Sequence, residues 1–431
     1  MSSKMTITER AAAAESASIR LAATKTEAKN TALNQIAKAL QDRSSEIVAA
    51  NREDLEAAER EDLAAPLLKR LKFDEAKLAD VCAGIQSLIK LDEPVGKTLA
   101  AIELDEGLEL YRVSCPIGVI GVVFESRPDA LVQISTLCLK SGNGVLLKGG
   151  SEAARTNRIL AETIAEASEA AGLPAGWIQL LETRQDVTEM LALDEHIDLI
   201  IPRGSNEFVR YIMSHTNVPV LGHADGICHV YVAADAELEM ATRLVVDSKC
   251  QYVAVCNAAE TLLVDAAIAD EFLPMVKGAL EENHCRLKGC ERTGAVIDVE
   301  QAGDDDWATE YLDLVLSVKV VDGLDEAIEH INRYGSGHTD AIVTADRDKA
   351  ETFMNLVDSA DVFWNASTRF SDGFRYGLGA EVGISTNKIH ARGPVGLEGL
   401  VIYKWKLLGK GQTVAQYAGP NARKFTHKKL R

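Results

Sequence analysis

Short, almost continuously apolar runs alternate with helical stretches from residue 117 onward, and this alternation constrains the fold more than any other feature. Ile117 to Phe124 is one such run, a helix is predicted over Ala130 to Lys140, and Gly144 to Lys148 is a second run. Strands that are apolar on both faces and separated by helices are typical of a parallel sheet covered on both sides. We therefore predict an α/β fold.

The alternation runs through two cycles, which predicts two α/β domains in series with a boundary near residue 230. The strands expected in the first cycle continue at 178–182, 198–202 and 218–221, after a long helix at 152–171. In the second cycle we expect strands at 229–232, 261–264, 295–297, 315–321, 341–343 and 361–365, and helices at 238–246, 268–282, 324–332 and 349–357.

Three further segments complete the expected architecture. The first 90 or so residues have helical spacing, as in 31–40, and we expect these helices to cover a sheet. Residues 104–114 and 399–408 alternate polar and apolar side chains, which is compatible with an edge hairpin or with an arm that pairs with another subunit. The resulting division is a domain over 1–230 interrupted by 100–115, a second domain over 231–392, and a small β arm made of 100–115 with 393–431.

Composition excludes several classes of function. The chain has 431 residues, 47% of them hydrophobic and 26% charged, as in ordinary globular proteins. A formal net charge of −19 argues against binding nucleic acid, which needs a positive face. No apolar run approaches the roughly 20 residues of a membrane span, and the start of the chain is too polar for a secretory signal. We therefore expect a cytoplasmic protein whose eight cysteines are thiols. No metal site is expected, because His284, Cys285 and Cys290 lack the paired spacing of zinc ligands.

Cys256 stands out among the eight cysteines. It lies in a short polar turn beside Asn257, directly before an apolar run that is expected to form a strand. A cysteine nucleophile needs a fixed backbone, an open approach and nearby hydrogen-bond donors. Buried cysteines are also common as small core hydrophobes. Taken alone, the segment fits catalysis and core packing equally well.

A dinucleotide site of the common type is not indicated. No G-x-G-x-x-G motif follows a predicted strand, and Gly142-Asn143-Gly144 precedes one, which is the wrong order. A nicotinamide cofactor, if bound, must therefore be held by a different arrangement.

Seven segments in one order point to such an arrangement. They are Phe124-Glu125-Ser126-Arg127-Pro128-Asp129, Leu147-Lys148-Gly149-Gly150-Ser151-Glu152, Ile201-Pro202-Arg203-Gly204-Ser205, Gly226-Ile227-Cys228-His229-Val230-Tyr231-Val232, the Cys256 segment, Trp364-Asn365-Ala366-Ser367-Thr368-Arg369-Phe370, and Gly379-Ala380-Glu381-Val382-Gly383-Ile384-Ser385-Thr386. With these segments the chain resembles the aldehyde dehydrogenase superfamily over nearly its whole length. The resemblance implies two Rossmann-like domains and a small β oligomerisation arm.

The resemblance assigns roles to individual residues. It implies that Cys256 is the nucleophile and that Lys148 contacts the adenosine ribose of the cofactor. Gly204 and Ser205 open a helix whose N-terminal amides face the pyrophosphate, since such helix ends attract anions. Glu381 is expected to hydrogen-bond the nicotinamide ribose.

Ser151 bears on the choice of cofactor. Many NAD-using relatives carry a glutamate at this place, and serine leaves room for a 2′-phosphate without repelling it. NADPH is therefore the expected cofactor. Ser151 before Glu152 is also a good helix N-cap, and both interpretations can hold together.

Two departures from the wider superfamily suggest the direction of the reaction. His223 stands where hydrolytic members carry the glutamate that activates water, which is consistent with chemistry that needs no water, although a structural histidine is the simpler interpretation. Ser126 stands where an oxyanion asparagine is expected. The backbone amide of Cys256 and the neighbouring Asn257 then remain as candidate oxyanion donors.

The resemblance is closest to the branch that reduces L-glutamyl 5-phosphate to L-glutamate 5-semialdehyde in proline biosynthesis. It implies a thioacyl enzyme on Cys256, and we expect the site to lower the pKa of that thiol with positive charge or a helix end. Arg127 and Arg369 are candidate partners for the anionic substrate, or surface arginines. Asn365 either helps to position substrate or satisfies backbone groups.

Other functions remain open at this stage. An NAD-dependent aldehyde-oxidising enzyme on the same fold and a non-redox scaffold are the alternatives, and the reductase half of a bifunctional synthase is a third. The expected partners are the small-molecule substrate, a glutamate 5-kinase that supplies it, and further copies of this chain in a homo-oligomer.

Overall fold

The computed structural model describes residues 5–223 and 225–430, which form two compact units. The first unit comprises residues up to 204 together with 210–220 and 395–431, and the second comprises 205–209 and 221–394. Each unit contains a parallel sheet with helices, so the predicted α/β fold is confirmed. The roles that we assigned to the predicted domains stay predictions.

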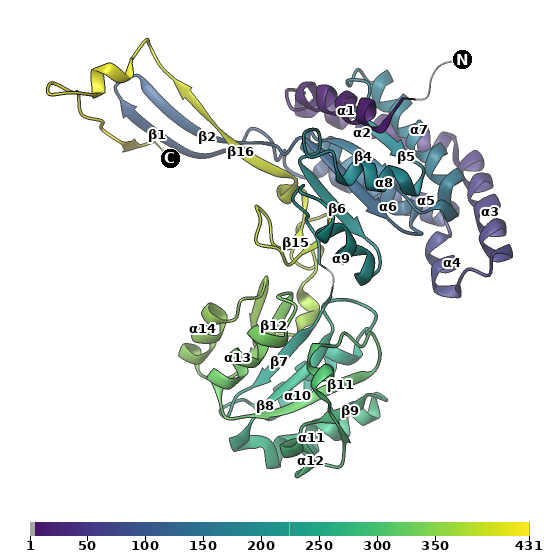
Figure 1. The fold of residues 1–431 in the computed structure, drawn as a ribbon, viewed down its shortest axis with the longest axis vertical. Helices are drawn as coiled ribbons and strands as arrows, with labels where there is room; N and C mark the ends of the chain where they lie inside the picture. The colour runs from purple at the N-terminus through teal and green to yellow at the C-terminus, as the bar shows by residue number, and fades with distance from the viewer. Residues whose placement is uncertain (1–4, 224, 431) are drawn as a thin grey trace. The chain divides into compact units, whose positions relative to one another are not determined.

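The first unit is built on a four-stranded parallel sheet in the order β5-β4-β3-β6 (Figure 1). Every residue of β3 and β4 is buried, as expected for strands covered on both faces. The strands are β3 (Val119–Phe124), β4 (Gly144–Lys148), β5 (Ile178–Leu181) and β6 (Leu199–Arg203). The helices of this part of the chain are α1 (Ile7–Leu21), α2 (Thr26–Asp42), α3 (Ser44–Arg60), α4 (Ala65–Leu71), α5 (Glu75–Lys90), α6 (Pro128–Ser141), α7 (Ala154–Ala170), α8 (Arg184–Leu191) and α9 (Asn206–Ser214), with the 3₁₀ turn η1 (Ser151–Ala153) before α7.

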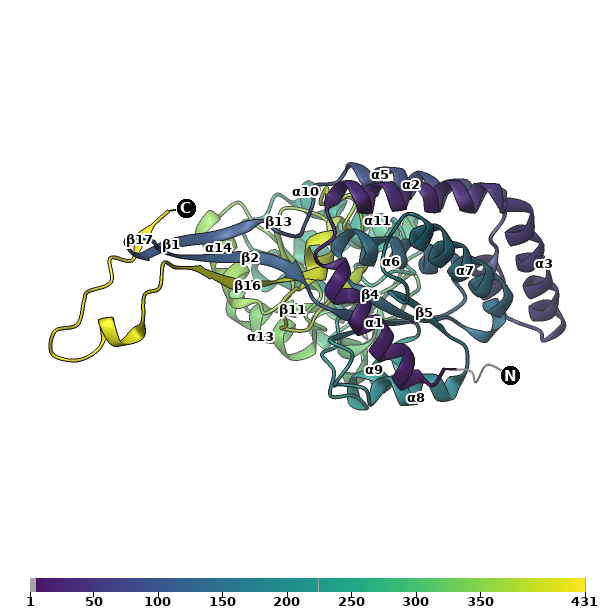
Figure 2. The ribbon, with the colours of Figure 1, turned by 90° about the horizontal axis from the view of Figure 1, so that it is seen from above.

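The N-terminal region is helical, as predicted. In α2 the buried residues include Leu33, Ile36, Ala37 and Leu40, which recur at three and four positions and make one apolar face. Figure 2 shows α2 running beside α5, with which it is in contact.

The two alternating segments pair with each other in a four-stranded antiparallel sheet of order β16-β2-β1-β17. Its strands are β1 (Thr98–Asp105), β2 (Leu108–Pro116), β16 (Val401–Leu408) and β17 (Lys428–Lys429). β16 is an edge strand whose large side chains stay exposed, with Trp405 at 52% and Leu407 at 56%. An exposed apolar edge strand is a template for pairing with another chain, which supports the oligomerisation role without testing it.

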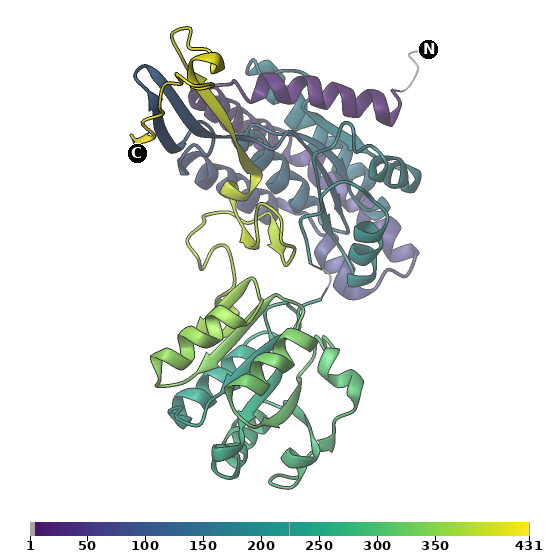
Figure 3. The same ribbon diagram turned by 60° about the vertical axis from the view of Figure 1, so that its left-hand side comes forward.

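The second unit contains a seven-stranded sheet in the order β10-β9-β11-β8-β7-β12-β13, in which all pairs are parallel (Figure 3). Its strands are β7 (Cys228–Val232), β8 (Ala259–Asp265), β9 (Arg286–Gly289), β10 (Glu300–Gln301), β11 (Val315–Val321), β12 (Thr339–Val343) and β13 (Asp361–Trp364). The helices are α10 (Leu238–Cys250), α11 (Ala269–Glu282), α12 (Glu291–Gly294), α13 (Leu324–Tyr334) and α14 (Arg347–Leu356). The 3₁₀ turns are η2 (Ala266–Ile268), η3 (Asp304–Ala308), η4 (Thr368–Phe370), η5 (Leu397–Leu400) and η6 (Val414–Tyr417), and β14 (Gly383–Ser385) pairs with β15 (Gly393–Val395).

Alternate residues of the central strands fill two separate cores. Val230 and Val232 of β7 pack on one face with Phe272 of α11, whereas Tyr231 packs on the other face with Phe353 of α14. Side chains of a strand alternate between faces, so a strand that is apolar throughout needs helices on both sides. This second unit is therefore a three-layer α/β/α arrangement.

Two predicted strands are wrong. At 218–221 only one bridge forms, between Val220 and Ile200, because Pro219 has no N–H to extend a ladder. At 295–297 the chain instead continues the turn that ends α12, and the backbone N–H groups of Val296 and Ile297 donate to the carbonyl of Thr293. Among the described residues, no helix combines the length and the apolar character that crossing a membrane requires.

Candidate active site

The segment that carries Cys256 connects α10 to β8 in the second unit, as predicted. Its backbone is held from two directions. A Cβ atom on Gly226 would lie 2.1 Å from the carbonyl oxygen of Cys256, so the two backbones approach at a distance that only glycine permits. The thiol of Cys228 donates to the same carbonyl oxygen at 3.2 Å. The nucleophile candidate therefore has the fixed backbone that covalent catalysis requires.

His338 is the nearest functional partner of this cysteine. Its Nε2 lies 3.1 Å from the Sγ of Cys256, and its Nδ1 lies 2.7 Å from the hydroxyl of Thr339. Burial, and secondarily the neighbouring His223, holds the pKa of His338 well below its ordinary value. The ring is therefore neutral and able to accept a proton from the thiol.

His338 was not predicted, and the topology explains why. Cys228, Cys256 and His338 come at or just before the starts of β7, β8 and β12, which are neighbours in the sheet. The amino ends of parallel strands share one edge, so these residues meet there. The signal in the sequence was a polar residue directly before an apolar run, but the order of the strands is needed to bring the three runs together.

His223 lies against the same pair of residues. Its ring meets that of His338 edge-on at 5.1 Å between centroids, and its Nδ1 is 3.0 Å from the carbonyl oxygen of Ile384. Since a carbonyl only accepts, Nδ1 carries the proton and Nε2 carries the lone pair. The hydrogen bond to Ile384 fits the structural interpretation of His223.

The electrostatic surroundings correct the expectation that the site lowers the thiol pKa. Burial, and after it the carboxylates of Glu310 and Glu381, raise the pKa of Cys256 to about 12, and Arg369 opposes them. Cys256 follows the C-terminal end of α10, so this helix does not present its N-terminus to the sulfur. Cys256 is therefore a thiol whose sulfur faces a neutral imidazole.

Asn257 anchors the nucleophile segment. Its side-chain amide donates to the carbonyl of Ser371 at 2.8 Å, and its own carbonyl accepts from the hydroxyl of Thr368 at 2.7 Å. Both partners belong to the stretch around η4. Asn257 therefore ties Cys256 to the stretch that carries Arg369.

Arg369 is buried, with 7% of its surface exposed. Its Nε donates to the Oε1 of Gln251 at 3.1 Å, and its buried Nη1 has no hydrogen-bond partner within the part of the chain that the structure describes. A buried guanidinium N–H without a partner is costly unless an anion completes it. Gln251 is a residue that sequence reasoning did not select, and here it orients the arginine.

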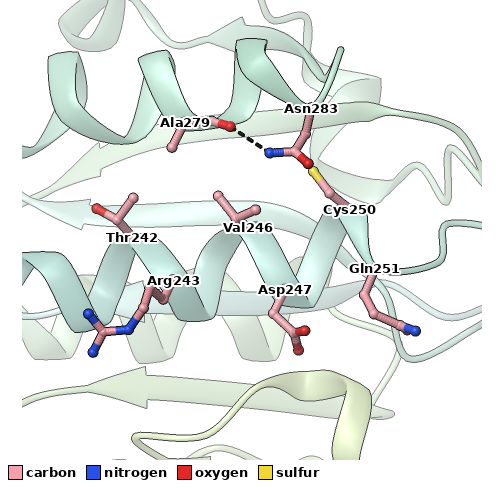
Figure 4. A pocket seen from close by; sticks show the side chains of 8 residues that line it. All are labelled: Thr242, Arg243, Val246, Asp247, Cys250, Gln251, Ala279 and Asn283. Carbon is pink, nitrogen blue, oxygen red and sulfur yellow. Dashed lines mark hydrogen bonds between the residues drawn. The ribbon is translucent and has the colours of Figure 1, made fainter.

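Figure 4 shows Gln251 among the residues that line a surface pocket of about 440 Å³ between α10 and α11. The pocket is also lined by Cys250, Asp247 and Arg243, and the amide of Asn283 donates to the carbonyl of Ala279. Cys256 is not among its lining residues. We therefore do not assign this pocket to the reaction.

Asn365 lies at the carboxyl ends of the parallel strands, whereas Cys256 lies at their amino ends. It follows the last residue of β13, its side-chain oxygen accepts from the N–H of Thr344 at 3.0 Å, and its amide donates to the Thr344 carbonyl at 3.0 Å. Strands of four or five residues separate their amino and carboxyl ends by about 13–16 Å. The geometry favours the backbone-satisfying role, and the left-handed φ of 52° at Asn365 turns the chain back toward Arg369.

Three predicted site residues of the first unit are Ser126, Ser151 and Lys148. Ser126 contacts the carboxylate of Glu152, and the other two lie near Glu152 in the sequence. Ser126 donates its backbone N–H and its hydroxyl to the Oε1 of Glu152 at 2.7 and 2.6 Å, and it has a left-handed φ of 42°. Ser151 is exposed and is the first residue of η1, so the N-cap interpretation is wrong, because Gly150 and Ala153 hold the capping positions. Lys148 ends β4 and donates to the Gly149 carbonyl.

The remaining predicted residues have the following contacts. Arg127 pairs with Asp129 at 3.3 Å and is 44% exposed, which favours the surface interpretation. Gly204 and Ser205 directly precede α9, and the Ser205 hydroxyl accepts from the N–H of Phe208 at 3.4 Å, as a residue at a helix start does. Glu381 accepts from the N–H of Gly373 at 2.8 Å and is close enough to Cys256 to affect its pKa.

Comparison with known proteins identifies the family of this chain. The model of the aldehyde dehydrogenase family matches residues 1–304, and the chain belongs to that family. It is therefore an enzyme of the oxidoreductase class, as predicted. The protein called gamma-glutamyl phosphate reductase of Acetivibrio thermocellus is 66% identical over 426 residues, which cover 99% of each chain. A protein of the same name from Methanococcoides burtonii is 54% identical over 97% of this chain and 95% of its own.

Solved structures agree with this family assignment. The crystal structure of gamma-glutamyl phosphate reductase from Thermotoga maritima has a TM-score of 0.92 and 40% identity, and the match covers 94% of this chain and 99% of that one. An engineered glycolyl-CoA reductase with bound NADP⁺, at 15% identity and a TM-score of 0.61 over 93% and 96% of the two chains, shares the fold. The resemblance that we inferred from seven short segments is confirmed.

Proposed function

We propose that the chain reduces L-glutamyl 5-phosphate to L-glutamate 5-semialdehyde with NADPH and releases inorganic phosphate, as a step of proline biosynthesis. The name of the relatives at 66% identity supports the substrate. The observation that carries the chemistry is the contact of 3.1 Å between the Cys256 Sγ and the Nε2 of a neutral His338. A thiol with a raised pKa needs such a base at the moment of attack.

The first half of the reaction is acyl transfer. His338 accepts the thiol proton while Sγ attacks the γ-carbonyl carbon, and the C–O bond to phosphate breaks, leaving a thioester on Cys256. The backbone N–H of Cys256 and the Asn257 side chain remain our candidate donors to the developing oxyanion. Asn257 also holds the segment in place through Ser371. Ser126 donates its hydroxyl hydrogen bond to Glu152, so we assign it to shaping the first unit.

Arg369 is our candidate for holding the anionic substrate. Its buried Nη1 has no partner among the described residues, and its charge lowers the pKa of Cys256. A carboxylate or phosphate beside it satisfies the guanidinium. Arg127 and Asn365 were the other predicted substrate contacts, and their contacts with Asp129 and Thr344 support structural roles instead.

The residues of the proposed cofactor site fit a phosphorylated dinucleotide. Lys148 supplies a cation at the end of β4, Ser151 presents an exposed uncharged hydroxyl, and the carboxylate of Glu152 is occupied by Ser126. Ser205 starts α9, whose N-terminal N–H groups favour anions. When bound, NADPH supplies the hydride that reduces the thioester carbonyl. Glu381, hydrogen-bonded to Gly373, is held ready for the ribose.

The acyl phosphate substrate implies a supplier. Mixed anhydrides of this kind hydrolyse in water, so an ATP-dependent kinase acting on the γ-carboxylate, a glutamate 5-kinase, must provide it close by. We also propose a homo-oligomer assembled through the β arm, on the strength of the exposed edge of β16.

The test runs the reaction backwards, because the forward substrate is unstable. Glutamate 5-semialdehyde, inorganic phosphate and NADP⁺ are supplied, and the absorbance of reduced cofactor is recorded. We expect phosphate-dependent turnover that is lost in Cys256→Ala and kept in the matched control Cys250→Ala, whose thiol lines the pocket of Figure 4.

Two results contradict the proposal. Turnover that needs no phosphate indicates a hydrolytic aldehyde dehydrogenase with His223 as a base for water. A Cys256→Ala variant as active as wild type removes the nucleophile from the mechanism.

A further inference from the structure

Three potential metal ligands, one of them the proposed nucleophile, converge in the second unit. The ligand atoms of His223, Cys256 and His338 all lie within 4.8 Å of one another. Each imidazole uses its Nδ1 on the far side, on the carbonyl of Ile384 for His223 and on the hydroxyl of Thr339 for His338. Metal-binding histidines are oriented in this way, with one ring nitrogen held by an oxygen so that the other presents its lone pair.

The donor set selects the kind of ion. Two imidazole nitrogens and one thiolate match the three protein ligands of open tetrahedral zinc sites, which leave a fourth position for water. Hard cations such as Mg²⁺ and Ca²⁺ prefer oxygen and are not matched. Bond lengths of about 2.0–2.3 Å place tetrahedral ligand atoms about 3.4–3.6 Å apart. The observed 3.1 Å between Cys256 and His338 must open slightly, and the longer separations must close, which side-chain rotations achieve.

We propose that Cys256, His338 and His223 form a binding site for a thiophilic divalent cation such as Zn²⁺, and that its occupation reversibly blocks the nucleophile. The S–H bond of Cys256 breaks, a sulfur–metal bond forms, and the proton leaves to solvent without any transfer of electrons. The metal-binding part stands on this geometry alone. The blocking part rests on the proposed role of Cys256 as nucleophile.

The experiment uses the full chain after treatment with a chelator. Co²⁺ is titrated first, because a thiolate ligand gives it an intense charge-transfer absorption, and Zn²⁺ is then used to displace it. We expect one tightly bound ion per chain whose charge-transfer band disappears in Cys256→Ser, and an affinity about tenfold or more weaker in His223→Ala. The matched control is Cys285→Ser, which removes another buried thiol and should leave the titration unchanged. Circular dichroism verifies that each variant is folded.

The outcomes separate this proposal from the proposed function. The site is overturned if folded wild type binds no Co²⁺ through sulfur, or if Cys256→Ser keeps the same band. Inhibition of semialdehyde oxidation by Zn²⁺, reversed by chelator, supports the blocking role, and full activity at saturating Zn²⁺ overturns it. A wild type that binds Zn²⁺ through Cys256 but never turns over refutes the proposed function and supports the metal site.

Discussion

Gly226 offers the sharpest test of how tightly the nucleophile is held. A Cβ at this position would lie 2.1 Å from the carbonyl oxygen of Cys256 and 2.3 Å from its Cα, where ordinary contact begins at 3.4 Å. Both neighbours are backbone, so neither can rotate away. In Gly226→Ala the two segments must therefore separate by about 1.3 Å, because close-packed interiors do not absorb such an overlap.

The expected loss of activity follows from this displacement. A shift of about 1 Å in a reacting group costs about 10²-fold in rate, which is about 2.7 kcal/mol of transition-state stabilisation. The same shift breaks the hydrogen bond from the Cys228 thiol to the Cys256 carbonyl. We therefore expect kcat in the phosphate-dependent oxidation of glutamate 5-semialdehyde to fall about 100-fold or more in a folded Gly226→Ala variant.

A matched substitution separates this effect from the general cost of replacing glycine. Gly278 lies within α11, and a Cβ there meets nothing within 4 Å. Gly278→Ala should leave kcat unchanged and stabilise the protein by about 0.5–1 kcal/mol, since alanine is the better helix former. If Gly226→Ala folds and keeps kcat within twofold of wild type, the inferred constraint on the nucleophile segment is wrong.

Three further predictions concern charge. Lys249 and Glu260 form an ion pair of 2.5 Å in which neither side chain is exposed, so Lys249→Met leaves a buried unpaired carboxylate and should destabilise β8 by about 3–5 kcal/mol at pH 8. Burial raises the pKa of Glu260 to about 7 even beside Lys249, so without the lysine the buried carboxyl must take up a proton. This uptake costs less as pH falls toward the ordinary value of 4.5, so the loss should shrink at pH 5; amide hydrogen exchange in β8 measures it, and a loss independent of pH contradicts the reasoning. Because the pKa of Cys256 is raised to about 12, its alkylation by iodoacetamide should still rise about tenfold per pH unit between about pH 9.5 and pH 10.5, whereas a plateau above about pH 9.5 would mean an ordinary thiol. Ser151→Glu should raise KM for NADP⁺ about tenfold or more relative to NAD⁺, and an unchanged ratio would remove Ser151 from the cofactor site.

The elements that the sequence predicts best are those whose pattern is local. The strand at 144–148 and the helix around 130–140 follow directly from apolar runs and spacing, and both are confirmed. The strand expected at 218–221 fails because one proline outweighs its apolar neighbours. Local pattern also placed Cys256 correctly between a helix and a strand.

The surroundings of the site depend on contacts between distant segments, which a single sequence does not reveal. His338 is 82 residues from Cys256, and only the order of the strands brings them together. The same order carries Asn365 to the far edge of the sheet. The direction of the pKa shift was mistaken for a related reason, because the burial of Cys256 and the approach of Glu310 and Glu381 arise only after folding. Resemblance to a family supplied the proposed nucleophile but not the histidine that contacts it.

Gly226, Cys256 and His338 all lie just before the amino ends of strands. The two ends of the sheet in the second unit should therefore tolerate inserted residues differently. Cys256 precedes β8 by three residues and His338 precedes β12 by one, so an inserted residue at either place would rotate the side chain away from its partner. At the carboxyl ends of the strands, β8 ends at Asp265, and Asp322 and Thr344 follow β11 and β12. None of Gly226, Cys256 and His338 lies there. Peptide tags, reporter loops or fused domains inserted at that end should leave the chemistry untouched, which makes it the natural place to attach this enzyme to another protein.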